Sequence, residues 1–422
     1  MAFPPEPYPP AGRPLAGTGV VPPTQHPPPH VPPTQQPPHT APWGAGGPPG
    51  APSAPWQVRP QRRGSTVWAV LGILVAAVAL LVSVTLIAVM TGPGAAFVGA
   101  VVALVPLVGV LLGIRWIDRW EPEPRGALIF AFLWGAGVST LVSLLVNTMF
   151  TEAVFISTGS VETAELVGAS VIAPLVEETA KGVGVLVLFL ARRRYFDGPV
   201  DGLVYAATVA AGFAFVENIL YFGRSIEVLP QIFIMRGLMS PFAHVLFTAA
   251  IGIALGIAAR SRSRNAWLLA LPVGWLVAVA LHALWNGSTF TDAFFGMYLL
   301  VQLPLFACGI VIILWLRRSE RRIIEHRLVD YARAGWFAPH EVAMLSSFPA
   351  RRTARRWAGR GGPGAVRDMK VFQRAATDLA FLRQRAATGR AQHDFPHEER
   401  ALLERVTGSR AAFLRTVAGA RA

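Results

Sequence analysis

The chain has 422 residues, of which 53% are apolar and only 15% are charged, and its mean hydropathy is +0.46. Soluble domains usually carry about a quarter charged residues, so this composition excludes a soluble enzyme or a nucleic-acid-binding core and favours a chain that lies mostly in lipid. A single cysteine, Cys308, excludes an intrachain disulfide framework and a CxxC metal site. The net charge of +14 is uneven, because the residues from Arg317 onward hold 22 Lys and Arg against 10 Asp and Glu.

Residues 1–65 form a proline-rich region with almost no charge. They contain 21 of the 35 prolines and too few apolar side chains to build a core. Such a stretch is predicted to be disordered and to sample extended polyproline conformations. It serves as a spacer, or alternatively as a ligand for a proline-recognising module of a partner protein.

Eight apolar segments follow between residues 66 and 316. They are 66–90, 95–114, 126–150, 166–191, 199–222, 232–259, 266–286 and 294–316. Each is near the roughly 20 residues that a helix needs to cross a bilayer core of about 30 Å. Backbone groups in lipid must form their hydrogen bonds within the segment, so these segments are predicted to be helices. The fold class is therefore an all-α, polytopic membrane helix bundle with about eight spans.

The loops between these segments alternate in charge. Arginines occur before the first segment and after the second, fourth, sixth and eighth, whereas the other four loops contribute only Arg224. Basic loops stay on the cytoplasmic side, so this alternation predicts eight spans with both termini in the cytoplasm. The frequent use of Arg, Ala and Gly, with only two lysines, is typical of a GC-rich bacterial genome, and we expect the protein in the bacterial plasma membrane.

Residues 317–422 are basic and helical in pattern. One apolar stripe begins at Ile323, Pro339 is placed to open a second helix, and a third stripe runs from Phe372 to Leu382. Gly359–Gly364 is predicted to be a linker. The region is interpreted as a small cytoplasmic helical module whose arginines face solvent or anionic headgroups. It has no nucleic-acid-binding motif, and we expect no nucleic acid partner.

Polar and ionisable residues are concentrated in four of the eight segments. The fourth to seventh segments contain, in order, Glu177, Glu178 and Lys181; Glu217 and Asn218; Ser240 and His244; His282 and Asn286. An ionisable group in a membrane span costs at least a few kcal/mol, so each of these residues needs a partner or a function. With a rise of about 1.5 Å per residue, the acids and histidines lie between the outer end and the middle of the bilayer. We expect them to line one cavity that opens to the external side.

The spacing of these residues suggests how they interact. Glu177 and Lys181 are four residues apart and are predicted to form an ion pair, whereas Glu178 lies about 100° further around the helix. Pro174 and Pro241 are placed to kink two of the helices. The polar residues bond helix to helix, or form the active site of an enzyme, or line the cavity of a proton-coupled transporter or of a non-catalytic membrane pseudoenzyme.

Four motifs in this series resemble a known family. Glu177-Glu178-x-x-Lys181, Phe213-x-x-x-Glu217-Asn218, His244 and His282-x-x-x-Asn286 are similar to the motifs of PrsW-type intramembrane proteases, which are relatives of the CAAX-protease and bacteriocin-processing superfamily. The segment Asp118-Arg119-Trp120-Glu121-Pro122-Glu123-Pro124 also resembles a juxtamembrane motif of that family. The resemblance covers residues 66–316. It implies hydrolysis of a peptide bond in or beside the membrane, in a substrate similar to a membrane-anchored anti-sigma factor.

Peptide hydrolysis needs an activated water, a stabilised oxyanion and a protonated leaving amine. Glu177 is the predicted general base, and Glu178 shares this role or orients the water. His244 and His282 hold the water, protonate the amine or stabilise the oxyanion, to which Asn286 can donate. Lys181 holds the glutamate in place, with Glu217 and Asn218 in supporting positions.

A second version of this chemistry adds one divalent metal ion, such as zinc. Two histidines and one glutamate form a common catalytic zinc site with a position left for water, and here the ligands are Glu177 or Glu217 with His244 and His282. Sequence does not choose between the two versions. Ser240 as a nucleophile beside His244 is the weakest alternative because it lacks a GxSxG context. In every version the partners are a membrane-anchored protein and the lipid bilayer.

Overall fold

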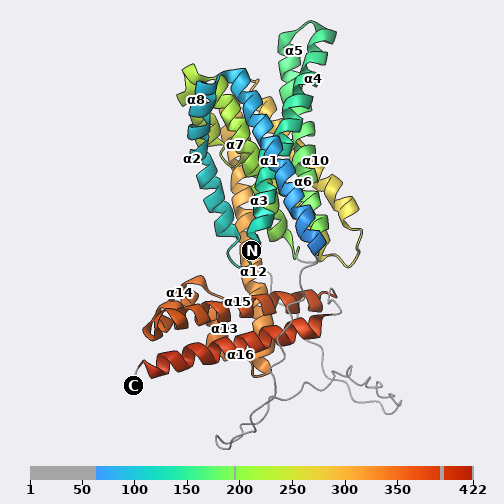
Figure 1. Cartoon of the computed structure of the whole chain (residues 1–422). Helices are drawn as coiled ribbons and strands as arrows, with labels where there is room; N and C mark the ends of the chain where they lie inside the picture. Colours follow the sequence, from blue (N-terminus) through green and yellow to red (C-terminus); the bar gives the residue numbers. More distant parts are fainter. Residues whose placement is uncertain (1–62, 194–195, 390–393, 421–422) are drawn as a thin grey trace, which may run out of the picture. The chain divides into compact units, whose positions relative to one another are not determined.

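The structure is a computed structural model that describes residues 63–193, 196–389 and 394–420. Every regular element in these ranges is a helix, which confirms the predicted all-α class (Figure 1). The proline-rich region 1–65 lies almost entirely outside the described residues, so its predicted disorder stays a prediction.

Seven helical runs are long and apolar enough to cross a membrane. They are α1 (Arg63–Thr91), α2 (Pro93–Ile117), α3 (Arg125–Leu133) with η1 (Trp134–Ser139) and α4 (Thr140–Thr158), α7 (Pro199–Arg224), the run Ile226–Arg260, α10 (Trp267–Ser288) and the run Phe294–Arg333. The predicted fourth span is helical as well, as α5 (Val161–Val167), η2 (Gly168–Ile172) and α6 (Ala173–Ala191). It is not among the seven because α6 carries Glu177, Glu178 and Lys181. These helices confirm a polytopic membrane bundle.

Helix α7 lies at the centre of this bundle, and 83% of its most apolar stretch is buried. Small residues let neighbouring backbones approach it closely. A Cβ placed on Gly202 would lie 1.9 Å from the carbonyl oxygen of Gly252, and one on Gly212 would lie 2.1 Å from that of Phe132. Only glycine fits at these positions, so the sequence itself fixes how α7 crosses its neighbours. This contact places the polar end of α7, with Glu217, next to the other functional helices.

The predicted segments leave residues 151–165 as an external loop. This prediction is wrong, because most of these residues are helical. Helix α4 continues to Thr158, and Gly159 ends it in the left-handed region with φ of 66°. Ser160 then caps α5 by accepting a hydrogen bond from the backbone N–H of Thr163 at 3.1 Å. The result is a helical hairpin, α4–α5, that extends beyond the neighbouring helices at the top of Figure 1.

The sixth span is interrupted at the place where Pro241 predicts a kink. The chain forms η3 (Ile226–Val228), α8 (Leu229–Phe233) and η4 (Ile234–Met239), leaves the helix at Ser240–Phe242, and resumes as α9 (Ala243–Arg260). Proline cannot donate the backbone hydrogen bond that a continuous helix requires. The interruption puts His244 in the first turn of α9.

The last membrane run continues into the C-terminal region. After α11 (Phe294–Met297) and η5 (Tyr298–Gln302), helix α12 (Leu303–Arg333) passes without a break through residue 317 and carries the exposed Cys308. The chain then forms α13 (Pro339–Leu345), α14 (Phe348–Ala358), η6 (Gly359–Gly361), α15 (Gly362–Ala387) and α16 (Phe395–Gly419). The predicted linker 359–364 is therefore mostly helical. Helices α13–α16, called the C-terminal module below, share a buried apolar cluster with the end of α12 and with Trp120 of the α2–α3 loop.

Candidate active site

Helices α6, α7, α9 and α10 bring six of the predicted residues into one buried cluster. Glu178 and Lys181 are fully buried, His282 is 1% exposed and Glu177 is 5% exposed. Glu217 and His244 complete the cluster through a contact of 2.8 Å between the histidine Nε2 and a carboxylate oxygen. The two histidine rings lie edge to face, with centroids 5.1 Å apart.

The carboxylate of Glu178 has all of its oxygens engaged. It accepts from Lys181 Nζ at 2.6 Å, from Thr248 Oγ1 at 2.8 Å and from His282 Nδ1 at 3.0 Å. These contacts come from α6, α9 and α10, so Glu178 ties three helices together. A carboxylate held in this way orients its neighbours and has no free oxygen for a substrate water.

Glu177 differs from Glu178, as their angular separation on the helix predicts. One oxygen, Oε1, accepts from Asn147 Nδ2 at 3.3 Å. The other, Oε2, is buried and has no hydrogen-bond partner among the described residues. It faces Lys181 Nζ at 3.6 Å and His282 Nε2 at 3.8 Å. A buried carboxylate oxygen without a hydrogen bond is costly unless it serves a ligand, so Oε2 is available to a ligand.

Each histidine is held by a carboxylate through one ring nitrogen. The Nδ1–H of His282 donates to Glu178, and the Nε2–H of His244 donates to Glu217, which assigns the tautomers from their acceptors. The other nitrogen of each ring carries no proton. A carboxylate behind a histidine is the arrangement that orients metal-ligating and catalytic imidazoles. Of these two nitrogens, His282 Nε2 faces Glu177, and His244 Nδ1 accepts from Lys181 Nζ at 3.3 Å.

Two cations lie among these acids. Lys181 Nζ is 3.3 Å from His244 Nδ1 and 4.1 Å from the ring centroid of Phe213. The guanidinium of Arg236, on η4, pairs with Glu217. With neutral histidines, three carboxylates against two permanent cations leave the cluster with one excess negative charge. This excess favours one more positive charge at the site, either as a proton or as a metal ion.

Arg236 also engages the second residue of the α7 motif. Its Nε donates to Asn218 Oδ1 at 2.8 Å, and its guanidinium lies over the ring of Tyr221 at 3.9 Å from the centroid. Asn218 thus positions Arg236, which positions Glu217, which in turn holds His244. These supporting residues form a chain of contacts that ends on the imidazole of His244.

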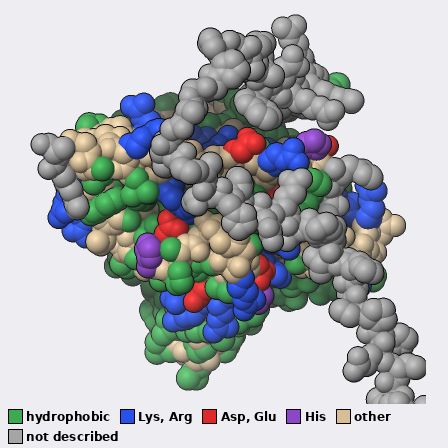
Figure 2. Space-filling view, turned by 90° about the horizontal axis from the view of Figure 1, so that it is seen from below, with side chains coloured by type: hydrophobic (Ala, Val, Ile, Leu, Met, Phe, Trp, Pro, Cys, Tyr) green, Lys and Arg blue, Asp and Glu red, His purple; other side chains and the backbone are tan. Residues whose placement is uncertain are grey.

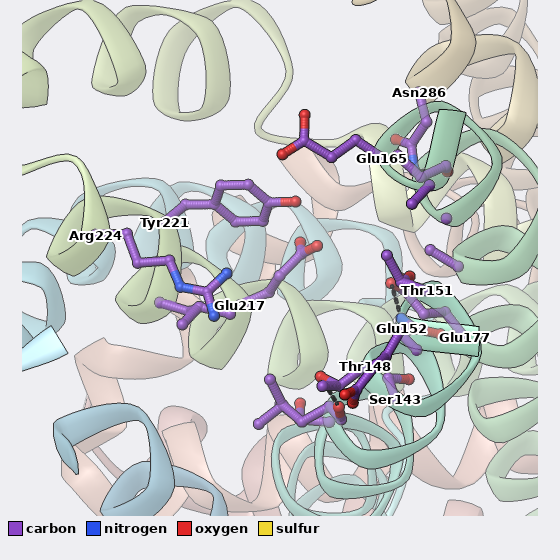
Figure 3. Close-up of a pocket in the computed structure, with 18 of the residues that line it drawn as sticks. Ser143, Thr148, Thr151, Glu152, Glu165, Glu177, Glu217, Tyr221, Arg224 and Asn286 are labelled. Carbon is purple, nitrogen blue, oxygen red and sulfur yellow. Dashed lines mark hydrogen bonds between the residues drawn. The ribbon is translucent and has the colours of Figure 1, made fainter. Parts of the chain in front are cut away.

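A cavity of about 560 Å³ reaches this cluster from the side of the α4–α5 hairpin. Glu177 and Glu217 lie at its inner wall, and Glu152, Glu165 and Arg224 lie nearer to the hairpin. Figure 3 shows Glu217, Tyr221 and Arg224 of α7 on one side of the cavity and the side chains of α4 on the other. A cavity therefore exists beside the predicted residues and leads to Glu177, but only Glu177 and Glu217 of the expected acids and histidines line it, and His244 and His282 do not.

Two predicted residues have other contacts. Asn286 lines the cavity, but its Nδ2 donates to the backbone oxygen of Ala169 at 2.9 Å rather than to the cluster. Ser240 donates to the backbone oxygen of Met235 at 2.8 Å and lies outside the helix of His244. The structure thus gives no support to Ser240 as a nucleophile.

Sequence reasoning missed three residues that contact the cluster. They are Asn147 on α4, Arg236 on η4 and Thr248 on α9. Arg236 could have been predicted from the sequence, because an arginine inside an apolar segment needs a partner as much as a glutamate does. Asn147 and Thr248 gave a weaker signal, since single amides and hydroxyls are common in membrane helices.

Comparisons with known proteins agree with this site. Residues 123–315 match the PrsW family intramembrane metalloprotease. Protease PrsW of Clostridioides difficile (strain 630) is 31% identical over 217 residues, which is 50% of this chain and 86% of that protein. Protease PrsW of Geobacillus kaustophilus (strain HTA426) is 30% identical over 198 residues, covering 46% of this chain and 80% of that protein. Protease PrsW of Bacillus subtilis (strain 168) is 29% identical over 168 residues, covering 39% and 72% respectively.

No solved structure matches the chain. The matched region contains all four motif helices, so the family likeness and the buried cluster coincide. These findings support the protease interpretation over the transporter, and a protease within the membrane acts on membrane-anchored protein in contact with lipid. The chain belongs to the PrsW family of intramembrane metalloproteases and is an integral membrane hydrolase that cleaves peptide bonds.

Proposed function

We propose that Glu177, His244 and His282 form the reaction centre of this protease and that the cavity above them binds the substrate peptide. One observation carries the proposal: the Oε2 of Glu177, which has no hydrogen-bond partner among the described residues, lies beside two histidines that are each held by another carboxylate. Such a set is prepared to bind and activate one water molecule.

In this mechanism Glu177 is the general base. Its free oxygen takes a proton from the water as the water oxygen bonds to the peptide carbonyl carbon. The unprotonated Nε2 of His282 accepts the second hydrogen of the water and so orients it, and the ammonium of Lys181 offsets the negative charge of the oxyanion that forms on the carbonyl oxygen. The carbon–nitrogen bond then breaks, and the proton held by Glu177 passes to the leaving amine. Glu178 and Glu217 keep the two imidazoles in the required orientation throughout.

The same residues fit a divalent metal ion such as zinc. One ligand atom from each of Glu177, His244 and His282 lies within 4.8 Å of the others. Two imidazoles and a carboxylate are a common catalytic zinc set, and both imidazoles have the carboxylate support that such ligands usually have. When bound, the metal would lower the pKa of a water and polarise the substrate carbonyl. Glu217 is not in this set, because its carboxylate pairs with Arg236 and His244.

One contact favours a metal-free variant of the mechanism. The ammonium of Lys181 is within 3.6 Å of Glu177 and 3.3 Å of His244, where it supplies positive charge of its own. Activity that is lost with a zinc chelator and returns with added zinc would establish the metal-dependent version. Activity that resists chelation would establish the glutamate version.

The cavity suits an extended peptide. Ser143 Oγ and Asn147 Oδ1 are buried on its α4 wall and have no hydrogen-bond partner among the described residues. A peptide that unwinds inside the membrane loses its internal hydrogen bonds and needs such partners. We propose that the substrate is a membrane-anchored regulator similar to an anti-sigma factor, which enters from the side of the α4–α5 hairpin.

We further propose that the protease core comprises residues 66–316 and that both termini lie in the cytoplasm. The alternation of arginine-rich loops supports this orientation. The cavity then opens to the external side, which suits an extracytoplasmic cut. Labelling of a Ser157→Cys variant from outside the cell, in a Cys308→Ala background, tests it, because a labelled hairpin is expected and a protected one contradicts the orientation.

The central experiment compares Glu177→Gln with Glu165→Gln. Both residues line the cavity, but only Glu177 reaches the histidines. Cleavage of a membrane-anchored reporter should stop with Glu177→Gln and continue with Glu165→Gln. Cleavage that survives Glu177→Gln in a folded, inserted protein would overturn the assignment.

A further inference from the structure

Two hollows lie at the end of the bundle where the C-terminal module packs. The first is a groove of about 630 Å³ between α2 and α3, with Thr208 of α7 among its lining residues. Its walls are mostly apolar and are formed by Leu111, Ile114, Leu128, Ile129, Phe132 and Leu133. Since α2 and α3 are membrane helices, this groove faces the hydrocarbon of the bilayer.

The end of this groove near the α2–α3 loop is positively charged. Arg115, Arg119 and Arg125 line it. Two acids are also present, but both are engaged by the protein: Asp118 accepts from the backbone N–H of Glu123 at 3.1 Å, and Glu123 accepts from Tyr205. Burial raises the pKa of each carboxyl to about 7, so near neutral pH they offset the arginines only in part.

The second hollow, of about 600 Å³, is basic throughout. It is lined by Arg119, Arg352, Arg355, Arg356 and Lys370, together with Gly359 and Val366. No acid lines it, and none of its five cations forms an ion pair with another described residue. Figure 2, which views this end of the protein, shows cationic side chains spread over the described surface. Five unpaired cations around one hollow repel one another unless an anion lies between them.

Arg119 lines both hollows, and aromatic side chains pack against it where the two hollows meet. Phe348 of α14 stacks on Trp120 with ring centroids 3.7 Å apart, and Arg119 lies over the Phe348 ring at 4.3 Å. Trp116, at the end of α2, is 40% exposed, as is typical of side chains at the membrane–water interface. Arg119 is one helical turn beyond it, so the basic hollow lies at the level of the lipid headgroups.

We propose that the two hollows together bind an anionic phospholipid. An acyl chain occupies the apolar groove between α2 and α3, and the phosphate lies among Arg119, Arg352, Arg355, Arg356 and Lys370. Charge complementarity and the position of the groove in the bilayer identify the occupant. A free phosphate would leave the groove unfilled, and a nucleic acid has no apolar chain to fill it. The bound lipid bridges the membrane helices and the C-terminal module.

The test uses the full chain, purified in detergent and stripped of lipid. Binding of phosphatidylglycerol and phosphatidylcholine is measured by native mass spectrometry and by the shift in melting temperature. We expect phosphatidylglycerol to bind and stabilise more strongly, and the triple variant Arg352→Gln, Arg355→Gln, Arg356→Gln to weaken its binding at least about tenfold. Ile129→Trp, which fills the groove, should weaken both lipids.

A matched control removes three exposed arginines elsewhere: Arg322→Gln, Arg400→Gln and Arg415→Gln. It should keep the preference for phosphatidylglycerol. If the α14 triple variant does not fold, Lys370→Gln takes its place. The proposal is wrong if the control loses the preference as well, if the α14 variant keeps it, or if glycerophosphoglycerol without acyl chains stabilises the protein as well as the whole lipid does.

Discussion

Replacing the two adjacent glutamates one at a time separates catalysis from stability. Glu177→Gln removes a carboxylate whose contacts are long, at 3.3 Å to Asn147 and 3.6 Å to Lys181, so we expect a loss of only about 1 kcal/mol in folding free energy. Because the general base is gone, cleavage should fall by about a hundredfold to ten-thousandfold.

Glu178→Gln, in contrast, should mainly reduce the folding stability. It breaks a 2.6 Å ion pair and leaves the ammonium of Lys181, which is fully buried, without its closest partner. Removing one member of a buried pair costs about 3–5 kcal/mol, which for a chain of this length corresponds to a melting temperature lower by about 5 °C. The second substitution Lys181→Met in this background should restore part of the stability, since it removes the buried ammonium that has lost its closest partner.

Both effects can be measured on the same samples. Melting in detergent, followed by the fluorescence of the tryptophans, reports stability, and cleavage of a membrane-anchored reporter in liposomes reports activity. Equal melting temperatures for Glu177→Gln and Glu178→Gln would refute the assignment of catalysis to Glu177 and of structural support to Glu178. So would a Glu177→Gln protein that melts about 5 °C below the wild type.

Three further predictions follow from other contacts. Asn147→Ala should lower kcat and leave the melting temperature nearly unchanged, because Asn147 orients Glu177 through one 3.3 Å hydrogen bond; a large loss of stability would contradict this. Burial raises the pKa of Asp118 from 3.8 to about 7, so the folded state loses stability as pH rises between these values, and the gain in melting temperature from Asp118→Asn should grow from about pH 5 to about pH 8. Gly202→Ala should prevent folding, because its Cβ would lie 1.9 Å from the Gly252 oxygen, whereas Gly94→Ala, in open space, should fold normally, as expression and size-exclusion profiles would show.

The sequence predicts the membrane bundle well because lipid leaves the backbone few alternatives. Apolar length and the helical requirement determine the number and type of spans, and Pro241 marks the interruption before His244. The hairpin at 151–165 was missed because hydropathy shows where a helix leaves lipid, not where it ends. Thr151, Glu152 and Glu165 are compatible with a loop, yet also with a helix exposed to water.

The sequence was enough to predict which residues form the cluster, but not which of them contact one another. Residue spacing put Glu177 and Glu178 on different faces and paired Glu177 with Lys181, whereas the structure places Lys181 nearer to Glu178, at 2.6 Å rather than 3.6 Å. Such distances depend on how α6, α9 and α10 pack. The sequence of one helix does not contain that information.

Helix α12 gives the C-terminal module a mechanical link to the active site. Its 31 residues form a rod about 46 Å long with no internal proline. Just before the rod, Tyr298 donates to the backbone oxygen of Met239 at 3.1 Å, beside the interruption that precedes His244. Gln302 donates to Ser288 Oγ at 2.5 Å, at the end of the helix that carries His282. The same continuous helical run therefore joins the C-terminal module to the segments that precede His244 and follow His282.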